Sequence, residues 1–394
     1  MDESTTDLLV EVPYLAHPDG YGQSATFLVY LINEISIEEG FTWRLLETNI
    51  TNNRLLIPHE LDYLAPIWVS PKHIPKADVL LRYSVPTEDR RGANRLISYT
   101  MFETDDTPPH FSNAFNVSDL VLTPTEWGKR VFEQSTNTPV AVCHVAMNPG
   151  FMKFLGEHKC IGSLPNVFTL ILNGTYHVNY DRKRHTELFH EFKKRHWEKR
   201  DIRLIFKARG MDRRLLKGVQ RSKRANIHSV SNPLVWPELL KLYLKSHVGV
   251  FPSKGEGWGM PQVELALLGR PIVYANNSAL TYVGPHMPWG IPVECNETEE
   301  ACYRIHSLYN TGDWYLCDME DFMDKVDMVY EEWRSDISAF NQKIYEAHSS
   351  NLMRDFVSHD VVKEQLREAI KSQLGRGLVN NEPKNIPSRN YKRR

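Results

Sequence analysis

The chain has 394 residues, of which 41% are hydrophobic and 24% charged, and its 47 Lys and Arg nearly balance 49 Asp and Glu. This length predicts two or three domains, and the net charge of −2 excludes both a highly charged disordered chain and a protein that is basic throughout for binding polyanions. The charge is unevenly distributed, because Asp181 to Arg224 holds 17 Lys and Arg against 6 Asp and Glu, a local charge of +11.

Three features of the sequence bear on where the protein works. No apolar run approaches the roughly 18 residues that cross a membrane, and the N-terminus is acidic and polar, unlike a secretory signal. The cysteines are odd in number, scattered and without a CxxC pair, which is typical of reduced thiols: Cys143, Cys160, Cys295, Cys302 and Cys317. We therefore expect a cytoplasmic protein.

Short apolar runs alternate with helical patterns along the chain, which predicts α/β layers built on parallel sheets. In the first half, the expected strands are Leu8–Val12, Phe41–Leu46, Val79–Leu81, Leu96–Met101, Leu120–Thr123 and Val140–Val145. The helices expected between them are Gln23–Ile35, His110–Asn116 and Glu126–Gln134.

The second half repeats this alternation. Its expected strands are Val167–Leu172, Ile202–Lys207, Ile227–Val230, Val248–Phe251 and Pro271–Ala275. Its expected helices are Arg184–Trp197, Pro237–Lys245, Met260–Leu268, Met319–His348 and Asn351–Leu374. Turn-forming residues between about Met147 and Pro165 predict a domain boundary, with α/β domains at 1–150 and 165–345, a final helix at 351–374 and a flexible tail at 375–394.

A glycine-rich turn follows the first expected strand and precedes a helix. Gly20 and Gly22 lie where ligands bind in α/β sheets, outside the carboxyl ends of strands, and the helix N-terminus adds free N–H groups for a phosphate or a sugar hydroxyl. A plain tight turn explains the same residues about as well.

The most informative segment runs Phe251-Pro-Ser-Lys-Gly-Glu-Gly-Trp-Gly-Met-Pro-Gln-Val-Glu264. A buried strand enters a loop with three glycines and leaves in a helix, so we expect free backbone amides and a positive helix end around a diphosphate, with no packing role for the glycines. Glu256 lies in the loop and Glu264 one turn into the helix. Carboxylates at such a pocket are suited to the vicinal hydroxyls of a ribose or hexose.

Two further groups of charged residues end strands. Arg182 and Lys183 follow the strand-ending Asn173-Gly174-Thr175, where they and Lys207 can neutralise a leaving diphosphate, although a solvated helix start explains them too. Glu103, with Asp105 and Asp106 after it, ends a first-half strand. These carboxylates can bind acceptor hydroxyls, act as a base, or cap the following helix. No His or Cys cluster has metal-ligand spacing, so we expect no metal.

In this order the motifs resemble the retaining nucleotide-sugar glycosyltransferases of the GT-B fold, specifically glycosyltransferase family 4. The segment from Phe251 to Val273 is similar to that family's Glu-x7-Glu block, with Trp258 in place of the usual Phe. The run Tyr-Thr-Met-Phe-Glu-Thr-Asp ending at Asp105, and Arg182-Lys183 before a helix, are similar to motifs of a bacterial subgroup. The resemblance covers about residues 8 to 290.

The resemblance implies two Rossmann-like parallel-sheet domains facing across a cleft, with a C-terminal helix crossing back to the first domain. The first domain would bind the acceptor and the second a nucleotide-diphosphate sugar, used as substrate without a cofactor or metal. Implied donor residues are Glu264 at the ribose, Arg182 and Lys183 at the diphosphate, Gly257, Trp258 and Gly259 cradling it, Glu256 at the transferred sugar, and Gly20 to Gly22 closing over it. The family's acceptor-side His has no match, so that Glu103 or Asp105 would serve instead.

The implied activity is a hexosyl or pentosyl transferase acting on a glycan, lipid-linked or small-molecule acceptor. The basic segment Arg182–Arg224 leaves a DNA acceptor open, as in phage enzymes that modify hydroxylated bases, and also a membrane-surface contact. A non-catalytic protein that binds sugar nucleotides is the third hypothesis.

Overall fold

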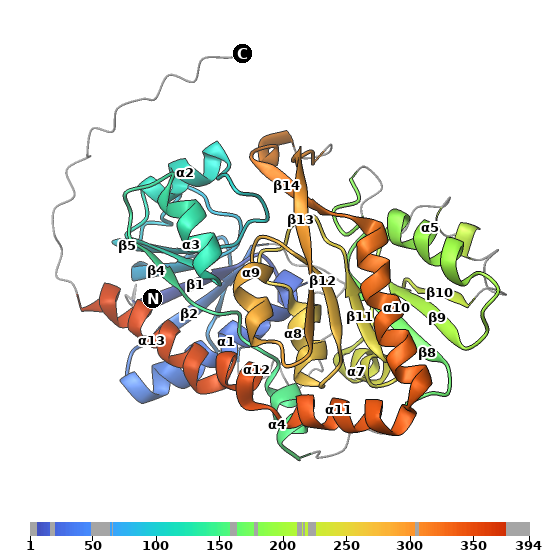
Figure 1. Ribbon diagram of the computed structural model, residues 1–394. Helices are drawn as coiled ribbons and strands as arrows, with labels where there is room; N and C mark the ends of the chain where they lie inside the picture. Colours follow the sequence, from blue (N-terminus) through green and yellow to red (C-terminus); the bar gives the residue numbers. More distant parts are fainter. Residues whose placement is uncertain are drawn as a thin grey trace, which may run out of the picture.

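The computed structural model describes residues 6–15, 20–48, 64, 66–157, 164–176, 180–210, 215, 217–219, 226–303 and 307–375. This part of the chain contains two seven-stranded sheets, one in each half, with helices packed around each (Figure 1). The expected fold class, two Rossmann-like parallel-sheet domains, is confirmed. Within the described residues, none of the helices has the length and apolar character needed to traverse a bilayer.

The first sheet has the order β3-β2-β1-β4-β5-β6-β7, and all its strands run parallel. Its strands are β1 (Thr6–Val12), β2 (Trp43–Glu47), β3 (Trp68–Val69), β4 (Ala77–Tyr83), β5 (Arg95–Tyr99), β6 (Leu120–Thr123) and β7 (Val140–Val142). The helices of this half are α1 (Gly20–Glu39), α2 (Pro109–Asn116) and α3 (Glu126–Glu133). Consecutive residues such as Leu8, Leu9 and Val10 are fully buried, as expected for a parallel sheet that is covered on both faces.

The second sheet has the order β10-β9-β8-β11-β12-β13-β14 and is parallel except for its last strand. Its strands are β8 (Phe168–Asn173), β9 (Ile202–Lys207), β10 (Ile227–Val230), β11 (Val248–Phe251), β12 (Ile272–Asn276), β13 (Gly290–Glu300) and β14 (Asp313–Cys317). Its main helices are α5 (His185–His196), α7 (Trp236–Leu244), α8 (Met260–Leu267), α9 (Leu280–Val283), α10 (Met319–Ser335) and α11 (Ile337–Ser349).

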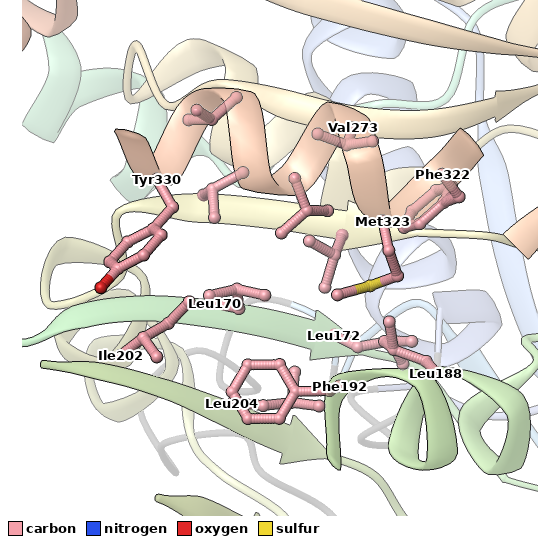
Figure 2. Packing of buried hydrophobic residues seen from close by; sticks show 14 of the residues in the cluster. Leu170, Leu172, Leu188, Phe192, Ile202, Leu204, Val273, Phe322, Met323 and Tyr330 are labelled. Atoms are coloured by element: carbon pink, nitrogen blue, oxygen red, sulfur yellow. The ribbon is translucent and has the colours of Figure 1, made fainter. Parts of the chain in front are cut away.

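The core of the second half lies between its sheet and two helices, as Figure 2 shows. Leu170 and Leu204 of neighbouring strands face Phe192 of α5 and Met323 of α10. The apolar residues of α10 recur at helical spacing, so that one face of it is buried against the strands.

The chain returns to the first half at its C-terminal end, as the fold class requires. Helix α12 (Asn351–Phe356) leads into α13 (His359–Leu374), which lies beside α1 (Figure 1). Leu366 and Ile370 join the first half's core, and Lys363 pairs with Glu38 of α1 at 2.9 Å. The crossing helix therefore packs on the same half that contains β1.

Several expected elements differ from those observed. The expected helix Met319–His348 is two helices, because Asp336 caps α11 by accepting a hydrogen bond from the Ala339 N–H. The expected helix Asn351–Leu374 is likewise divided, with Ser358 capping α13. The boundary stretch contains helix α4 (Pro149–Glu157), and the expected flexible tail lies, after Gly375, outside the described residues.

Candidate functional site

A cavity of about 410 Å³ lies between the two halves. The strands β1, β5, β8, β9 and β11 run parallel within their sheets, and described residues that follow their carboxyl ends line this cavity. The residues lining it are Gly20, Tyr21, Gln23, Ser24, Met101, Glu103 and Val145 from the first half, and Asn173, Gly174, Thr175, Arg182, Lys183, Lys207, Arg209, Leu239, Glu256, Gly257, Trp258, Gly259, Met260, Pro261 and Glu264 from the second.

The structure brings together nearly all of the residues expected at the site. Gly22 is the exception, because α1 begins at Gly20 and buries Gly22 within its first turn, where the Gly22 carbonyl accepts a hydrogen bond from Thr26. Among the described residues, no group of three or more His, Cys, Asp and Glu side chains is placed to hold a metal ion.

Glycines of the loop between β11 and α8 have a packing role, so the expectation that they have none is wrong. A Cβ on Gly255 would lie 2.1 Å from the Glu103 carbonyl oxygen, and one on Gly257 would lie 2.8 Å from Met101 Cγ. These two glycines let the loop approach the first half closely. Gly259 instead has a φ of +89°, which glycine adopts without strain, and α8 begins after it without a side-chain cap.

The centre of the site is a buried network of two cations and two carboxylates. Lys183 Nζ pairs with Glu256, and Arg182 reaches Glu256 Oε2 at 3.4 Å and Glu103 Oε1 at 3.1 Å. Burial favours the neutral form of Glu256, but Lys183 and Arg182 outweigh it and lower its pKa to about 2. Glu256 is therefore ionised at neutral pH and compensates cations that a phosphate group could otherwise bind.

Glu264 is in the opposite electrostatic state. It lies in α8 with its carboxylate buried, and the Tyr243 hydroxyl donates to its Oε2 at 2.7 Å. Burial raises the pKa of Glu264 to about 8, and the Tyr243 hydrogen bond offsets only part of that effect. The two glutamates, eight residues apart in the sequence, thus titrate on opposite sides of neutrality.

The acidic residues after β5 connect the two halves. Asp105 accepts hydrogen bonds from the Asp313 N–H at 2.7 Å and the Tyr315 hydroxyl at 2.9 Å, both on β14. Asp106 accepts one from Thr311 at 3.2 Å. Of these three described residues, Glu103 is the one that lines the cavity. The capping alternative is wrong, because α2 has no side-chain cap.

Two cations complete the cavity wall beyond the Arg182-Lys183 pair. Lys207, already expected at the end of β9, has its pKa lowered by burial and by nearby Arg209. Arg209 was missed, although its place just past the same strand end is the signal that would have found it. Part of the basic segment is compensated within the described residues, since Arg195 pairs with Asp324 and Asp327 on α10. Five of its cations lie outside them: Arg213, Arg214, Arg221, Lys223 and Arg224.

No protein-family model matches the chain, and no curated protein matches it in sequence. Solved structures do match. A glycosyltransferase from Rickettsia africae ESF-5 shares 14% identity over 94% of this chain and 100% of its own, with a TM-score of 0.60. The chain has the GT-B fold.

Other proteins of this fold are about equally similar. The catalytic domain of starch synthase IV from Arabidopsis thaliana, bound to ADP and acarbose, is 8% identical over 95% of this chain and 100% of its own, with a TM-score of 0.57. The E. coli trehalose-6-phosphate protein bound with UDP-2-fluoro glucose is 12% identical over 98% and 100%, with a TM-score of 0.56. At these identities the likeness concerns the fold alone.

Proposed function

We propose that the protein is a retaining glycosyltransferase of the family 4 type, which moves a hexosyl or pentosyl group from a nucleotide-diphosphate sugar to a hydroxyl acceptor. The observation that supports this most is the Arg182-Lys183 pair beside Glu256, in a cavity that also contains the N-terminus of α8 and Glu264. Proteins of the same fold hold ADP or a UDP-sugar analogue.

In this proposal the donor diphosphate lies against Arg182 and Lys183 and the backbone of Gly257–Gly259. Its negative charges replace the carboxylates that now compensate the two cations. As the bond between the anomeric carbon and the phosphate oxygen breaks, negative charge grows on the leaving diphosphate. Fixed cations in a buried cavity stabilise that charge, and with it the oxocarbenium-like transition state.

The two glutamates take different parts. Glu264, buried one turn into α8, is placed for the ribose hydroxyls, and Glu256, in the loop before α8, for hydroxyls of the transferred sugar. Glu103 approaches from the first half, where the acceptor binds in this proposal. The acceptor is a glycan, a lipid-linked sugar or a small molecule. Independence from metal and a cytoplasmic location remain predictions from the sequence.

The test is incubation of the full chain with a panel of UDP-, GDP- and ADP-sugars, followed by measurement of binding and of nucleotide release. Glu264→Ala should weaken donor binding, whereas Glu256→Ala should lower turnover more than binding. Glu133→Ala, at an exposed position of α3, serves as the matched control and should change neither. No binding to any donor would refute the proposal, binding without turnover would support a non-catalytic binder, and the reverse order of the two variants would overturn their roles.

A further inference from the structure

Two cysteines face each other across the antiparallel pair β13–β14. Cys295 and Cys317 are direct cross-strand partners, beside a register shift between Cys295 and Glu297. Cβ atoms of such partners lie about 4.5–5.5 Å apart, and a disulfide needs about 3.5–4.5 Å, so that a small adjustment suffices for a bond. Cys295 is partly exposed, whereas Cys317 is 2% exposed.

The surroundings of the pair make the two thiols chemically unequal. The neighbouring Cys317 thiol lowers the pKa of Cys295, and Asn277 and Arg184 add to this effect against burial and Glu294. The neighbouring Cys295 thiol and burial raise the pKa of Cys317. Because the thiolate is the reactive form, Cys295 is the nucleophile of the pair and Cys317 the second thiol that can resolve its oxidised form.

Each thiol also contacts a residue that supports the cavity wall. Arg184 Nη1 donates to the Cys317 carbonyl at 2.7 Å and lies 3.4 Å from Cys317 Sγ. Arg184 follows Lys183 directly and has a left-handed φ of 55°, so these contacts hold the turn that presents Arg182 and Lys183.

The second connection runs from Cys295 to the glycine loop. Asn277 Nδ2 lies 3.4 Å from Cys295 Sγ and donates to the Ser253 carbonyl at 2.8 Å. Ser278 donates to Asn277 Oδ1 at 2.9 Å, and its hydroxyl accepts from the Glu256 N–H at 2.8 Å. A shift of the Cys317 sulfur would therefore disturb Arg184, the neighbour of Lys183. A shift of the Cys295 sulfur would disturb Asn277 and, through it, Ser278, which contacts Glu256.

We propose that Cys295 and Cys317 form a redox-active pair, which peroxide converts to a disulfide and whose oxidation loosens the Arg182-Lys183 turn. The Cys295 thiolate attacks one peroxide oxygen, the O–O bond breaks, and the departing hydroxide takes a proton to become water. The Cys317 sulfur then attacks the sulfenic sulfur of Cys295, the S–O bond breaks, and the hydroxyl leaves as water with the Cys317 proton. Two thiols are oxidised and one peroxide is reduced to two waters.

The chemical test uses the full chain, treated with hydrogen peroxide, then denatured, alkylated and mapped by mass spectrometry. We expect a linked Cys295–Cys317 peptide, a mass 2 Da lower than that of the reduced pair, and reversal by dithiothreitol. In Cys317→Ser the oxidation should stop at a Cys295 sulfenic acid that dimedone labels. Cys302→Ser, which removes an exposed thiol outside the pair, should leave the linkage unchanged. The assignment is overturned if both thiols stay alkylatable or if either bonds to another cysteine.

The structural coupling is measured by hydrogen exchange, which does not depend on a substrate. Oxidation should speed amide exchange in the peptide spanning Asp181 to Glu187, whereas the oxidised Cys295→Ser variant should show no change. Unchanged exchange in the linked protein would overturn the coupling. A third readout, about tenfold weaker donor binding after oxidation, rests on the proposed function. If the reduced protein binds no donor, the proposed function fails while the peptide and exchange results still decide this inference.

Discussion

The replacement of Glu264 by Gln tests the electrostatic state of the cavity. Gln has the same shape and can still accept the Tyr243 hydrogen bond, but it cannot ionise. Burial raises the pKa of Glu264 from 4.5 to about 8, so the folded chain holds this proton more tightly than the unfolded chain does. The wild-type protein therefore loses stability as the pH rises from 4.5 to 8, and the variant avoids that loss.

The magnitude follows from the size of the shift. At about 1.4 kcal/mol per pKa unit, the wild-type protein loses at most roughly 5 kcal/mol of unfolding free energy by pH 9. Water that enters the cavity reduces this loss to about half. The free energy of unfolding of Glu264→Gln should equal that of the wild type at pH 4 and exceed it by about 2 kcal/mol at pH 9. Urea unfolding of nucleotide-free protein, followed by circular dichroism, measures this difference while cancelling the other titrating groups.

Glu256→Gln is the matched control with the opposite sign. The pKa of Glu256 is lowered to about 2, so its ionised form stabilises the protein above pH 4.5, and this contribution is lost as the pH falls toward 2. Its replacement leaves Lys183 buried with less compensation and should cost about 3 kcal/mol at pH 7. Parallel pH profiles for wild type and Glu264→Gln, or a stabilising Glu256→Gln, would refute this reasoning.

Three further predictions concern the contacts between the halves and the basic segment. Arg182→Gln removes an ion pair that joins the halves but leaves the Asp105 bonds to β14, so the radius of gyration in X-ray scattering should stay unchanged, and an increase would show that the ion pair holds the halves together. In thermal unfolding, Gly255→Ala should destabilise the chain by about 1–3 kcal/mol, because its Cβ would clash with Glu103. The control Gly156→Ala, in helix α4, places its Cβ where nothing lies within 4 Å, so it should be neutral or slightly stabilising in the same measurement. Binding to duplex DNA should fall only shallowly with salt, with a slope below about 3, because Arg182, Lys183, Lys207 and Arg209 of the basic segment line the cavity and Arg184, Lys194 and Arg195 pair with acids. A steep slope would instead favour a DNA acceptor.

The strands of the two sheets were predictable where burial on both faces leaves a continuous apolar run. Leu120–Thr123 and Ile202–Lys207 were expected with their observed bounds. Strand β13 was not expected, because its second half is exposed and acidic and depends on pairing with β14. That antiparallel pairing is a contact between two separate segments, so that only the folded chain reveals it.

The site was predictable for a different reason. Loops after parallel strands converge at one edge, and glycine density pointed to Glu256 and Glu264, whereas Arg182 and Lys183 were placed in the same cavity only with the family resemblance. The part played by Asp105 was not predictable, because it depends on a Tyr315 hydroxyl from the other half. The local sequence identifies polar side chains suited to a binding site. Contacts between the halves then determine which of these side chains line the cavity and which are used in hydrogen bonds elsewhere.

The distribution of charge around Arg182 suggests how a donor could alter the contact between the halves. Its guanidinium is shared between Glu103 of the first half and Glu256 of the second. A donor diphosphate would compete for the same N–H groups and would also be attracted by Lys207 and Arg209. Asp105 would still bond to β14, because its partners lie outside the cavity. Under the proposed function, donor binding is thus expected to free Glu103 while the halves stay joined, so that the acceptor would bind after the donor.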